Sequence, residues 1–260
     1  MNRLELLEGP GVECVYLEQE RPCDEIGITD LYIQTGRDGF FLYDAFARAL
    51  RQHQNTLGRF KFTVFNYVGE QENDDHLQDI YTIEYRWLKK LDLSVLGGWI
   101  PRNAPILEEL KMTANTIREH MAVLDTIPPK LKTLELHLDD HFGPRHTASL
   151  ERYLQRFPRH CQLKELVIHF ASLINITSVL NAIHGLDQLQ RLMISFTAQW
   201  DHHQMQRFID GLVKGCPKLA CLEIKCFNAP STHSMNALKQ LKYLERLAFS
   251  IKGMDGDDGF

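Results

Sequence analysis

One short pattern of apolar residues recurs along the whole chain of 260 residues. An apolar residue is followed by two mostly polar residues, a second apolar residue, one variable residue and a third apolar residue. The ten copies have their first, fourth and sixth positions at Val12-Val15-Leu17, Ile28-Leu31-Ile33, Leu57-Phe60-Phe62, Leu88-Leu91-Leu93, Leu107-Leu110-Met112, Leu131-Leu134-Leu136, Leu163-Leu166-Ile168, Leu189-Leu192-Ile194, Leu219-Leu222-Ile224 and Leu244-Leu247-Phe249. They begin about 26 residues apart on average, with intervals from 16 to 32. A repeat of this length predicts stacked units, each contacting only its neighbours.

The alternation within each copy is typical of a β-strand. It directs the fourth and sixth positions into a core and the third, fifth and seventh positions outward. Helical patterning lies between copies, at residues 41–54, 147–157, 176–183, 203–214 and 234–242. The period falls within the roughly 20 to 29 residues of leucine-rich repeats. We therefore expect an α/β leucine-rich-repeat solenoid, a curved horseshoe with a parallel sheet on its concave face and helices on its convex face.

The repeats indicate how the chain is organised. We expect a single solenoid of about ten irregular repeats over residues 1–251, followed by a flexible acidic tail over residues 252–260. Many leucine-rich repeats carry Asn at the ninth position, where its side chain satisfies buried backbone groups, but here the ninth position is Asn only at Asn115. Other groups must therefore satisfy the loops of this chain.

Composition excludes several functions. Lys and Arg number 29 against 34 Asp and Glu, so the net charge of -5 provides no basic field for nucleic acid. No apolar run approaches the roughly eighteen residues of a membrane span, and no secretion signal opens the chain. An intracellular protein, cytoplasmic or nuclear, with reduced cysteines is expected. The motifs G-x-S-x-G, H-E-x-x-H, G-x-x-x-x-G-K-[ST] and G-x-G-x-x-G are absent, so we expect neither an enzyme nor a cofactor.

Three segments resemble a known family. GCPKLACLEIKCFN at 215–228 resembles the cysteine-containing leucine-rich repeat, in which a Cys-Pro pair ends the helix, and HQNTLGRFKFT at 53–63 and HCQLKELVIHF at 160–170 follow the same plan. Repeats of this irregular kind are similar to those of F-box and leucine-rich-repeat proteins of the ribonuclease-inhibitor-like superfamily, especially divergent fungal ones. The resemblance implies recognition of a ubiquitin-ligase substrate by the repeats. The eleven residues before Val12 are too few for an F-box, so ligase components would bind through a segment absent here.

The outward positions of the strands are the expected binding surface for a protein partner. Val167 and Met193 hold the fifth position of consecutive copies, and exposed apolar neighbours there favour a protein contact. Tyr16 and Tyr32 are expected to form a second such pair. The fifth position otherwise carries charges of alternating sign. The expected partner-binding residues are Tyr16, Tyr32, Lys61, Asp92, Lys111, Glu135, His137, Val167, His169, Met193 and Glu223.

Two further clusters contain residue types that bind metals. His137 and His169 share the seventh position of consecutive copies, which places them roughly 5 Å apart in a sheet. In a chain with twelve histidines, a polar patch on the binding face is the favoured interpretation. Cys216, Cys221 and Cys226 are five residues apart, but Cys221 points outward and Cys226 points into the core, so packing is expected and no metal.

Two alternatives to substrate recognition remain open at this point. One is a regulator of a partner enzyme, resembling ribonuclease-inhibitor or GTPase-activating repeat proteins, although their repeats are nearly constant in length. The other is a purely structural repeat that has no independent partner.

Overall fold

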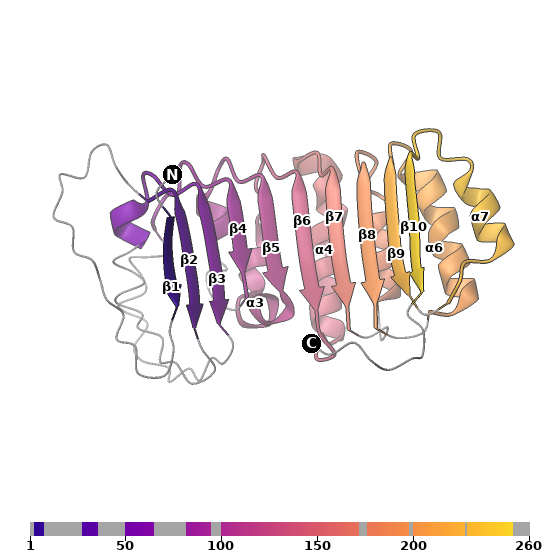
Figure 1. Ribbon diagram of the computed structural model, residues 1–260, viewed down its shortest axis with the longest axis horizontal. Coiled ribbons are helices and arrows are strands. Elements are labelled where there is room, and N and C mark those ends of the chain that lie inside the picture. The colour runs from indigo at the N-terminus through magenta and orange to yellow at the C-terminus, as the bar shows by residue number, and fades with distance from the viewer. Residues whose placement is uncertain are drawn as a thin grey trace. The chain divides into compact units, whose positions relative to one another are not determined.

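The structure is a computed structural model that describes residues 3–7, 28–35, 50–64, 82–94, 100–171, 176–197, 200–226 and 228–251. The chain divides into two compact units, Met1–Leu131 and Lys132–Phe260, here called unit 1 and unit 2. Each unit has a parallel sheet with helices on one side of it, which is the predicted α/β leucine-rich-repeat arrangement (Figure 1). The single solenoid over 1–251 stays a prediction, and the tail at 252–260 lies outside the described residues.

Unit 1 contains five described strands in sequence order. They are β1 (Arg3–Leu7), β2 (Asp30–Thr35), β3 (Arg59–Val64), β4 (Lys90–Leu93) and β5 (Glu109–Thr113), each paired in parallel with the next. The described parts of its connections include the helical residues 50–53, the 3-10 helices η2 (Ile100–Asn103) and η3 (Met121–Asp125), and α3 (Ala114–Glu119). More of the described buried apolar residues of this unit lie in the connections, for example Leu57, Tyr85 and Leu107, than in the strands.

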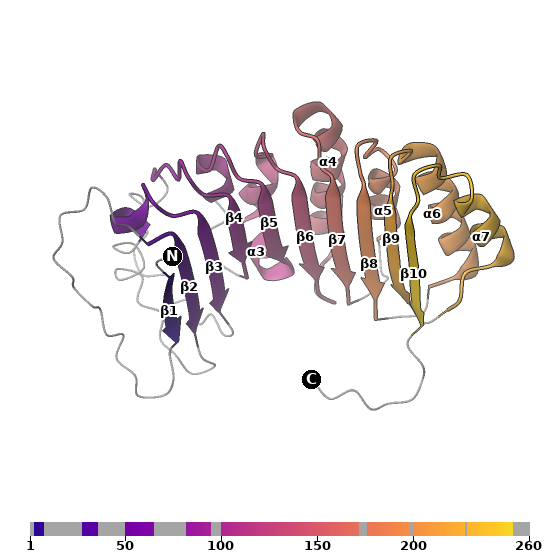
Figure 2. The same cartoon turned by 45° about the horizontal axis from the view of Figure 1, so that its top comes forward.

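Unit 2 contains longer helices. Its strands β6 (Thr133–Leu138), β7 (Glu165–Phe170), β8 (Arg191–Phe196), β9 (Cys221–Cys226) and β10 (Arg246–Ile251) are parallel and pair in sequence order. They alternate with α4 (Pro144–His160), α5 (Thr177–Ile183), α6 (His202–Gly215) and α7 (Thr232–Leu238). Figure 2 shows these helices together on one side of the unit 2 strands. The helix positions agree with the predicted helical segments at 147–157, 176–183, 203–214 and 234–242.

The repeat pattern predicts the strands closely. Every strand from β2 to β10 begins at the third position of a copy. The fourth and sixth positions are buried in β2 to β9, as in the alternation along β6, whereas in β10 Leu247 is 37% exposed and Phe249 is half-buried. The eighth position is buried wherever a described side chain occupies it. Because buried side chains face the helix layer, the opposite sheet face carries the third, fifth and seventh positions; we call it the open face.

The first strand differs from the prediction. β1 pairs with β2 in a register that places Arg3 beside Asp30, so the copy next to β2 begins at the N-terminus. The predicted first copy, Val12-Val15-Leu17, lies outside the described residues. The sequence analysis missed β1 because it took Val12-Val15-Leu17 as the first copy, although Met1, Leu4 and Leu6 also fit the apolar positions of the pattern.

A repeated backbone contact joins consecutive repeats just before each strand. The carbonyl oxygen at the second position of a copy accepts two N–H groups from the next copy. In unit 2, Lys164 and Glu165 both donate to the Lys132 oxygen at 2.8 and 2.9 Å, and Gln190 and Arg191 both donate to the Lys164 oxygen at 2.8 and 2.9 Å. In unit 1, Lys89 and Lys90 donate in the same way to Gly58. This ladder satisfies buried backbone groups without asparagine.

Side chains satisfy carbonyls at the other end of the strands. The hydroxyl of buried Thr116 donates to the Leu93 oxygen at 3.0 Å, and the Asn228 amide donates to the Trp200 oxygen at 2.9 Å. Each bond crosses to the preceding repeat. Asn115, the asparagine at the predicted position, is exposed and contacts Arg118 instead. The groups that replace the usual asparagine therefore lie one residue further on, at Thr116 and Asn228.

The cysteines behave as the alternation predicts. Among the described residues, Cys216 and Cys226 are buried and Cys221 is half-buried, and all are free thiols. Burial raises the pKa of the Cys216 thiol to about 12, so this sulfur stays protonated and packs as a small apolar group. The three residues therefore form no common metal site. In the described part of the chain, no helix has the length and apolar character needed to cross a membrane.

Candidate functional site

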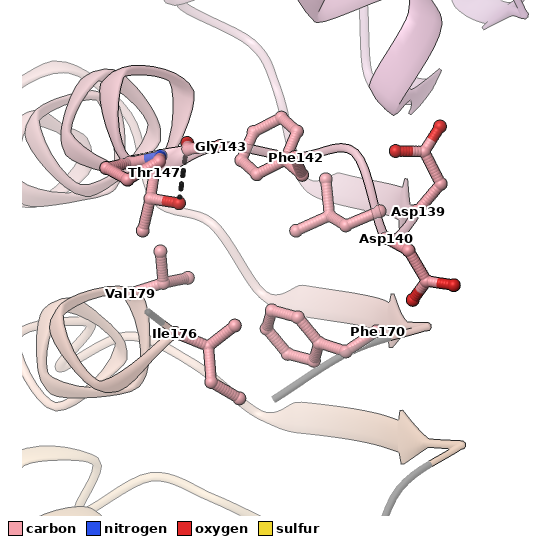
Figure 3. Close-up of a pocket in the computed structure, with 10 residues that line it drawn as sticks. Asp139, Asp140, Phe142, Gly143, Thr147, Phe170, Ile176 and Val179 are labelled. Atoms are coloured by element: carbon pink, nitrogen blue, oxygen red, sulfur yellow. Dashed lines mark hydrogen bonds between the residues drawn. The ribbon is translucent and has the colours of Figure 1, made fainter. Parts of the chain in front are cut away.

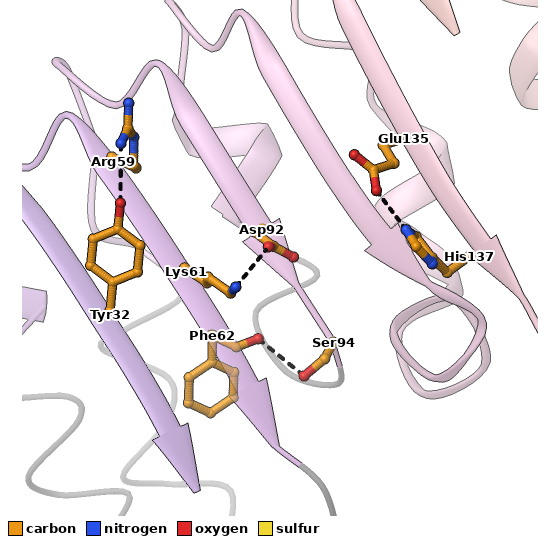
Figure 4. Close-up of polar contacts among 8 residues, drawn as sticks. All are labelled: Tyr32, Arg59, Lys61, Phe62, Asp92, Ser94, Glu135 and His137. Atoms are coloured by element: carbon orange, nitrogen blue, oxygen red, sulfur yellow. Dashed lines mark hydrogen bonds and ion pairs between the residues drawn. The ribbon is translucent and has the colours of Figure 1, made fainter. Parts of the chain in front are cut away.

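The open face of unit 1 carries a column of fifth-position side chains. Strand register places Tyr32, Lys61, Asp92 and Lys111 side by side across β2 to β5, as predicted. Lys61 Nζ lies 3.9 Å from Asp92 Oδ2 (Figure 4). These lysine and aspartate side chains are partly exposed, so this ion pair is a solvated surface contact.

The third-position side chains of unit 1 form further polar contacts. Arg59 Nη1 donates to the Tyr32 hydroxyl at 3.1 Å, and Lys90 Nζ lies 2.7 Å from Glu109 Oε1. The hydrogen bond to Tyr32 is the main cause that raises the pKa of the Arg59 guanidinium. The sequence analysis did not find these pairs, because it looked for neighbours only within the fifth-position and seventh-position columns. The Arg59–Tyr32 pair joins a third position to a fifth position, and the Lys90–Glu109 pair joins two third positions.

The predicted tyrosine pair is wrong. Tyr16 lies outside the described residues, and both register positions beside Tyr32 are taken by other residues. Glu5 of β1 lies on one side and Lys61 of β3 lies on the other. Because β1 begins at Arg3, the neighbour of Tyr32 is acidic instead of aromatic.

The open face of unit 2 has an apolar centre. Register places Val167 of β7 beside Met193 of β8, as predicted, with Glu135 of β6 and Glu223 of β9 on either side. Met193 is half-buried, whereas Val167 is only 9% exposed. Val167 is less accessible than expected because its short β-branched side chain stands between the longer side chains of Glu135 and Met193. The accessible part of this pair is therefore Met193.

The polar rim of this centre consists largely of intramolecular pairs. Arg191 Nη1 lies 3.1 Å from Glu165 Oε1, and Lys225 Nζ lies 3.4 Å from Glu223 Oε1. Charges that already have partners add modest affinity to a complex, but they restrict which partner can approach. An apolar residue surrounded by such pairs is the usual arrangement at the centre of a protein interface.

The two predicted histidines lie together on this face. His137 and His169 are opposite each other in the β6–β7 register, and their ring centroids are 4.3 Å apart with an interplanar angle of 34°. His137 Nε2 lies 2.6 Å from Glu135 Oε1, and Figure 4 shows these two side chains pointing toward each other from one strand. On the far side, His169 Nδ1 lies 2.6 Å from the Ser195 hydroxyl oxygen.

The sequence analysis listed Glu135 and the two histidines but did not combine them. The indication that it overlooked is the segment TLELHL, in which Glu135 and His137 are two residues apart and therefore share one face of a strand. Ser195 was missed, although it continues the seventh-position column of His137 and His169 onto β8.

A cavity of about 130 Å³ opens elsewhere in unit 2, beyond the ends of β6 and β7. Figure 3 shows Phe142, Phe170 and Ile176 lining it, with the carboxylates of Asp139 and Asp140 directed away from these apolar side chains. Ligand pockets for small organic molecules usually exceed about 300 Å³. The cavity is too small for such a ligand, so the open face is the stronger candidate site.

Comparison with known proteins adds little about function. No protein-family model matches the chain, and no curated protein matches its sequence. A crystal structure of a Bacteroides fragilis protein, a structural genomics target, is similar with 14% sequence identity and a TM-score of 0.40. The match covers 86% of this chain and 65% of that protein, so the chain spans slightly less than two thirds of its length. A likeness this weak supports no functional argument.

Proposed function

We propose that the chain is a non-catalytic module that recognises another protein through the open face of unit 2. The observation that carries the proposal is the Val167–Met193 pair, an apolar centre bordered by Glu135 and Glu223 across four neighbouring strands. Binding energy at interfaces concentrates in a few central side chains, and charged neighbours exclude wrong partners. The partner fitted by this surface presents an apolar side chain to Met193 within a polar border.

The resemblance of the repeats to those of F-box and leucine-rich-repeat proteins suggests a finer proposal. In it, the recognised protein is a ubiquitin-ligase substrate, and the ligase components bind through a segment outside this chain. The test is the lifetime of the captured protein in cells with and without this chain. A longer lifetime in its absence supports the ligase role, and an unchanged lifetime contradicts it.

Affinity capture from the native cell tests the recognition surface directly. Met193→Glu places a like charge beside Glu223 and removes the accessible apolar group, so we expect at least tenfold less partner on the bait. The double variant Val167→Glu/Met193→Glu should capture none. Thr63→Glu adds the same single negative charge at a half-buried outward position of unit 1 and serves as the matched control.

Thermal unfolding of each bait distinguishes loss of binding from loss of structure. Val167 is buried, so its substitution alone could unfold unit 2, whereas Met193 is half-buried and tolerates a charged side chain better. A folded Met193→Glu bait that captures the same partner as the wild type would place the recognition surface elsewhere.

A further inference from the structure

We propose that Glu135, His137 and His169 form a binding site for a transition-metal ion on the open face of unit 2, and that Zn²⁺ is the favoured ion. The site does not depend on the proposed recognition function, because it is defined by the chain alone. One potential ligand atom from each of the three residues lies within 4.8 Å of the others.

The strand register brings the three side chains together. His137 and His169 are direct neighbours in the parallel β6–β7 pair, and Glu135 precedes His137 by two residues on the same face of β6. Their Cα atoms are therefore held by the backbone hydrogen bonds of two adjacent strands. A site built on a sheet in this way needs only side-chain rotation to bind an ion.

The distances suit a small cation. Zinc binds histidine nitrogen at about 2.0–2.1 Å and carboxylate oxygen at about 2.0–2.2 Å, so tetrahedral ligand atoms lie roughly 3.3 Å apart. The Glu135–His137 contact, 2.6 Å without an ion, would widen by a fraction of an ångström as the ion replaces the shared proton. All the ligand atoms lie within 4.8 Å of one another, so the other pairs would close by at most about 1.5 Å.

The ligand types select the class of ion. Two imidazoles and one carboxylate favour zinc and its transition-metal neighbours, whereas calcium and magnesium prefer sites made of oxygen ligands. Two histidines and a glutamate are also a known donor set of zinc sites that keep a fourth position open. The side chains of His137 and Glu135 are 39% and 30% exposed, so an ion can enter and water can fill that position.

A contact outside the three ligands supports the geometry. Metal-binding histidines usually hydrogen-bond a second group through the ring nitrogen that does not bind the ion, and this bond fixes the ring. Ser195 of β8, the register neighbour of His169, lies 2.6 Å from its Nδ1. We therefore assign metal binding to Nε2 of His169, with Ser195 as a positioning residue.

Metal titration of the purified, chelator-treated full chain tests the site. We expect one Zn²⁺ per chain by calorimetry, and visible absorption bands of a low-symmetry site when Co²⁺ is the probe. His137→Gln, His169→Gln and Glu135→Gln should each weaken Zn²⁺ binding at least tenfold, and Ser195→Ala by about tenfold. His141→Gln and His203→Gln, which alter exposed histidines of the same unit, should leave it unchanged.

Equal Zn²⁺ affinity of the wild type and His137→Gln/His169→Gln would overturn the proposal. If that variant fails to fold, chemical modification of histidines in the wild type gives the answer instead. Zn²⁺ should then protect His137 and His169 but not His141 from modification, and equal modification of all three with and without Zn²⁺ would also refute the site.

Discussion

The open faces of the two units share one strand pattern but differ in chemistry. In unit 1 the fifth-position column runs from Tyr32 through charged residues, and Lys61 pairs with Asp92. In unit 2 the equivalent column has Val167 and Met193 at its centre, beside two histidines at the seventh position. The inward positions, by contrast, are apolar in both units and buried from β2 to β9. The repeat thus constrains the framework, whereas the outward positions vary freely and carry the candidate sites.

The described helices also differ. In unit 1 the stretch after β5 holds α3, of six residues, and the 3-10 helix η3, whereas α4 and α6 of unit 2 have 17 and 14 residues. In unit 2, α4 packs against α5 and α6 against α7. Unit 2 therefore depends on close helix packing as well as on its strands. Mutations in matched positions of the two units can separate these contributions.

The largest expected effect follows from the close approach of α5 and α6. A Cβ atom added at Gly215 would lie 1.8 Å from the His184 carbonyl oxygen, so Gly215→Ala forces the helix ends apart. We expect a loss of about 3 kcal/mol in the free energy of unfolding, measured by urea denaturation. At Gly58 of unit 1 the nearest atom would be the Thr29 oxygen at 3.5 Å, and Gly58→Ala should change stability by less than about 1 kcal/mol. Equal losses would remove the distinction between the units.

Side chains that satisfy loop carbonyls should matter equally in both units. Thr116→Val in unit 1 leaves the Leu93 oxygen without its hydroxyl donor, and Asn228→Ala in unit 2 does the same to the Trp200 oxygen. Each should cost about 1–2 kcal/mol in denaturant unfolding. Asn115→Ala, at the position where the repeat family places its asparagine, should cost less than about 0.5 kcal/mol because Asn115 is exposed. A larger cost at Asn115 than at Thr116 would contradict the observed bonding.

These carbonyl contacts show where prediction from the sequence succeeds and fails. From β2 onward every strand begins at the third position of a predicted copy, because periodic burial leaves a regular pattern in the sequence. Thr116 and Asn228 were not predicted, because a bond between repeats depends on how each loop turns. β1 was missed because Val12-Val15-Leu17 was taken as the first copy, although Met1, Leu4 and Leu6 fit the same pattern.

The same distinction explains why only part of the candidate site was predicted from the sequence. Position in the strand correctly paired His137 with His169 and Val167 with Met193. It could not show that Val167 is shielded by longer neighbours, or that Ser195 orients His169, because both depend on the lengths and rotamers of side chains from adjacent strands.

Acidic pH should destabilise both units through half-buried histidines. Burial is the main cause that lowers the pKa of His53 and His120 in unit 1 and of His184 in unit 2. Above about pH 6.5 these residues are neutral in both the folded and the unfolded chain. Below it the unfolded chain binds protons that the folded chain resists, so stability falls with pH until the folded-state pKa is reached.

Thermal unfolding between pH 8 and pH 5 measures this loss. His184→Gln should lose less stability on acidification than the wild type, and the exposed His203→Gln should behave as the wild type does. Protection factors for amide hydrogen exchange, which correct for the slower intrinsic exchange at acidic pH, should fall at pH 5.5 in both units. A fall confined to unit 2 would show that His53 and His120 do not contribute.

The smallest effects are expected from the ion pairs of the two open faces. Lys90→Gln breaks the contact with Glu109 in unit 1, and Arg191→Gln breaks the contact with Glu165 in unit 2. Each pair is partly exposed, so each substitution should change the free energy of unfolding by less than about 1 kcal/mol, and by less still in 1 M salt. Because the inward residues supply most of the stability, the outward ion pairs can determine which protein partner binds. If Lys90→Gln costs as much as Thr116→Val, the open face of unit 1 contributes to the framework, and the contrast between an apolar interior and a chemically varied open face applies to unit 2 alone.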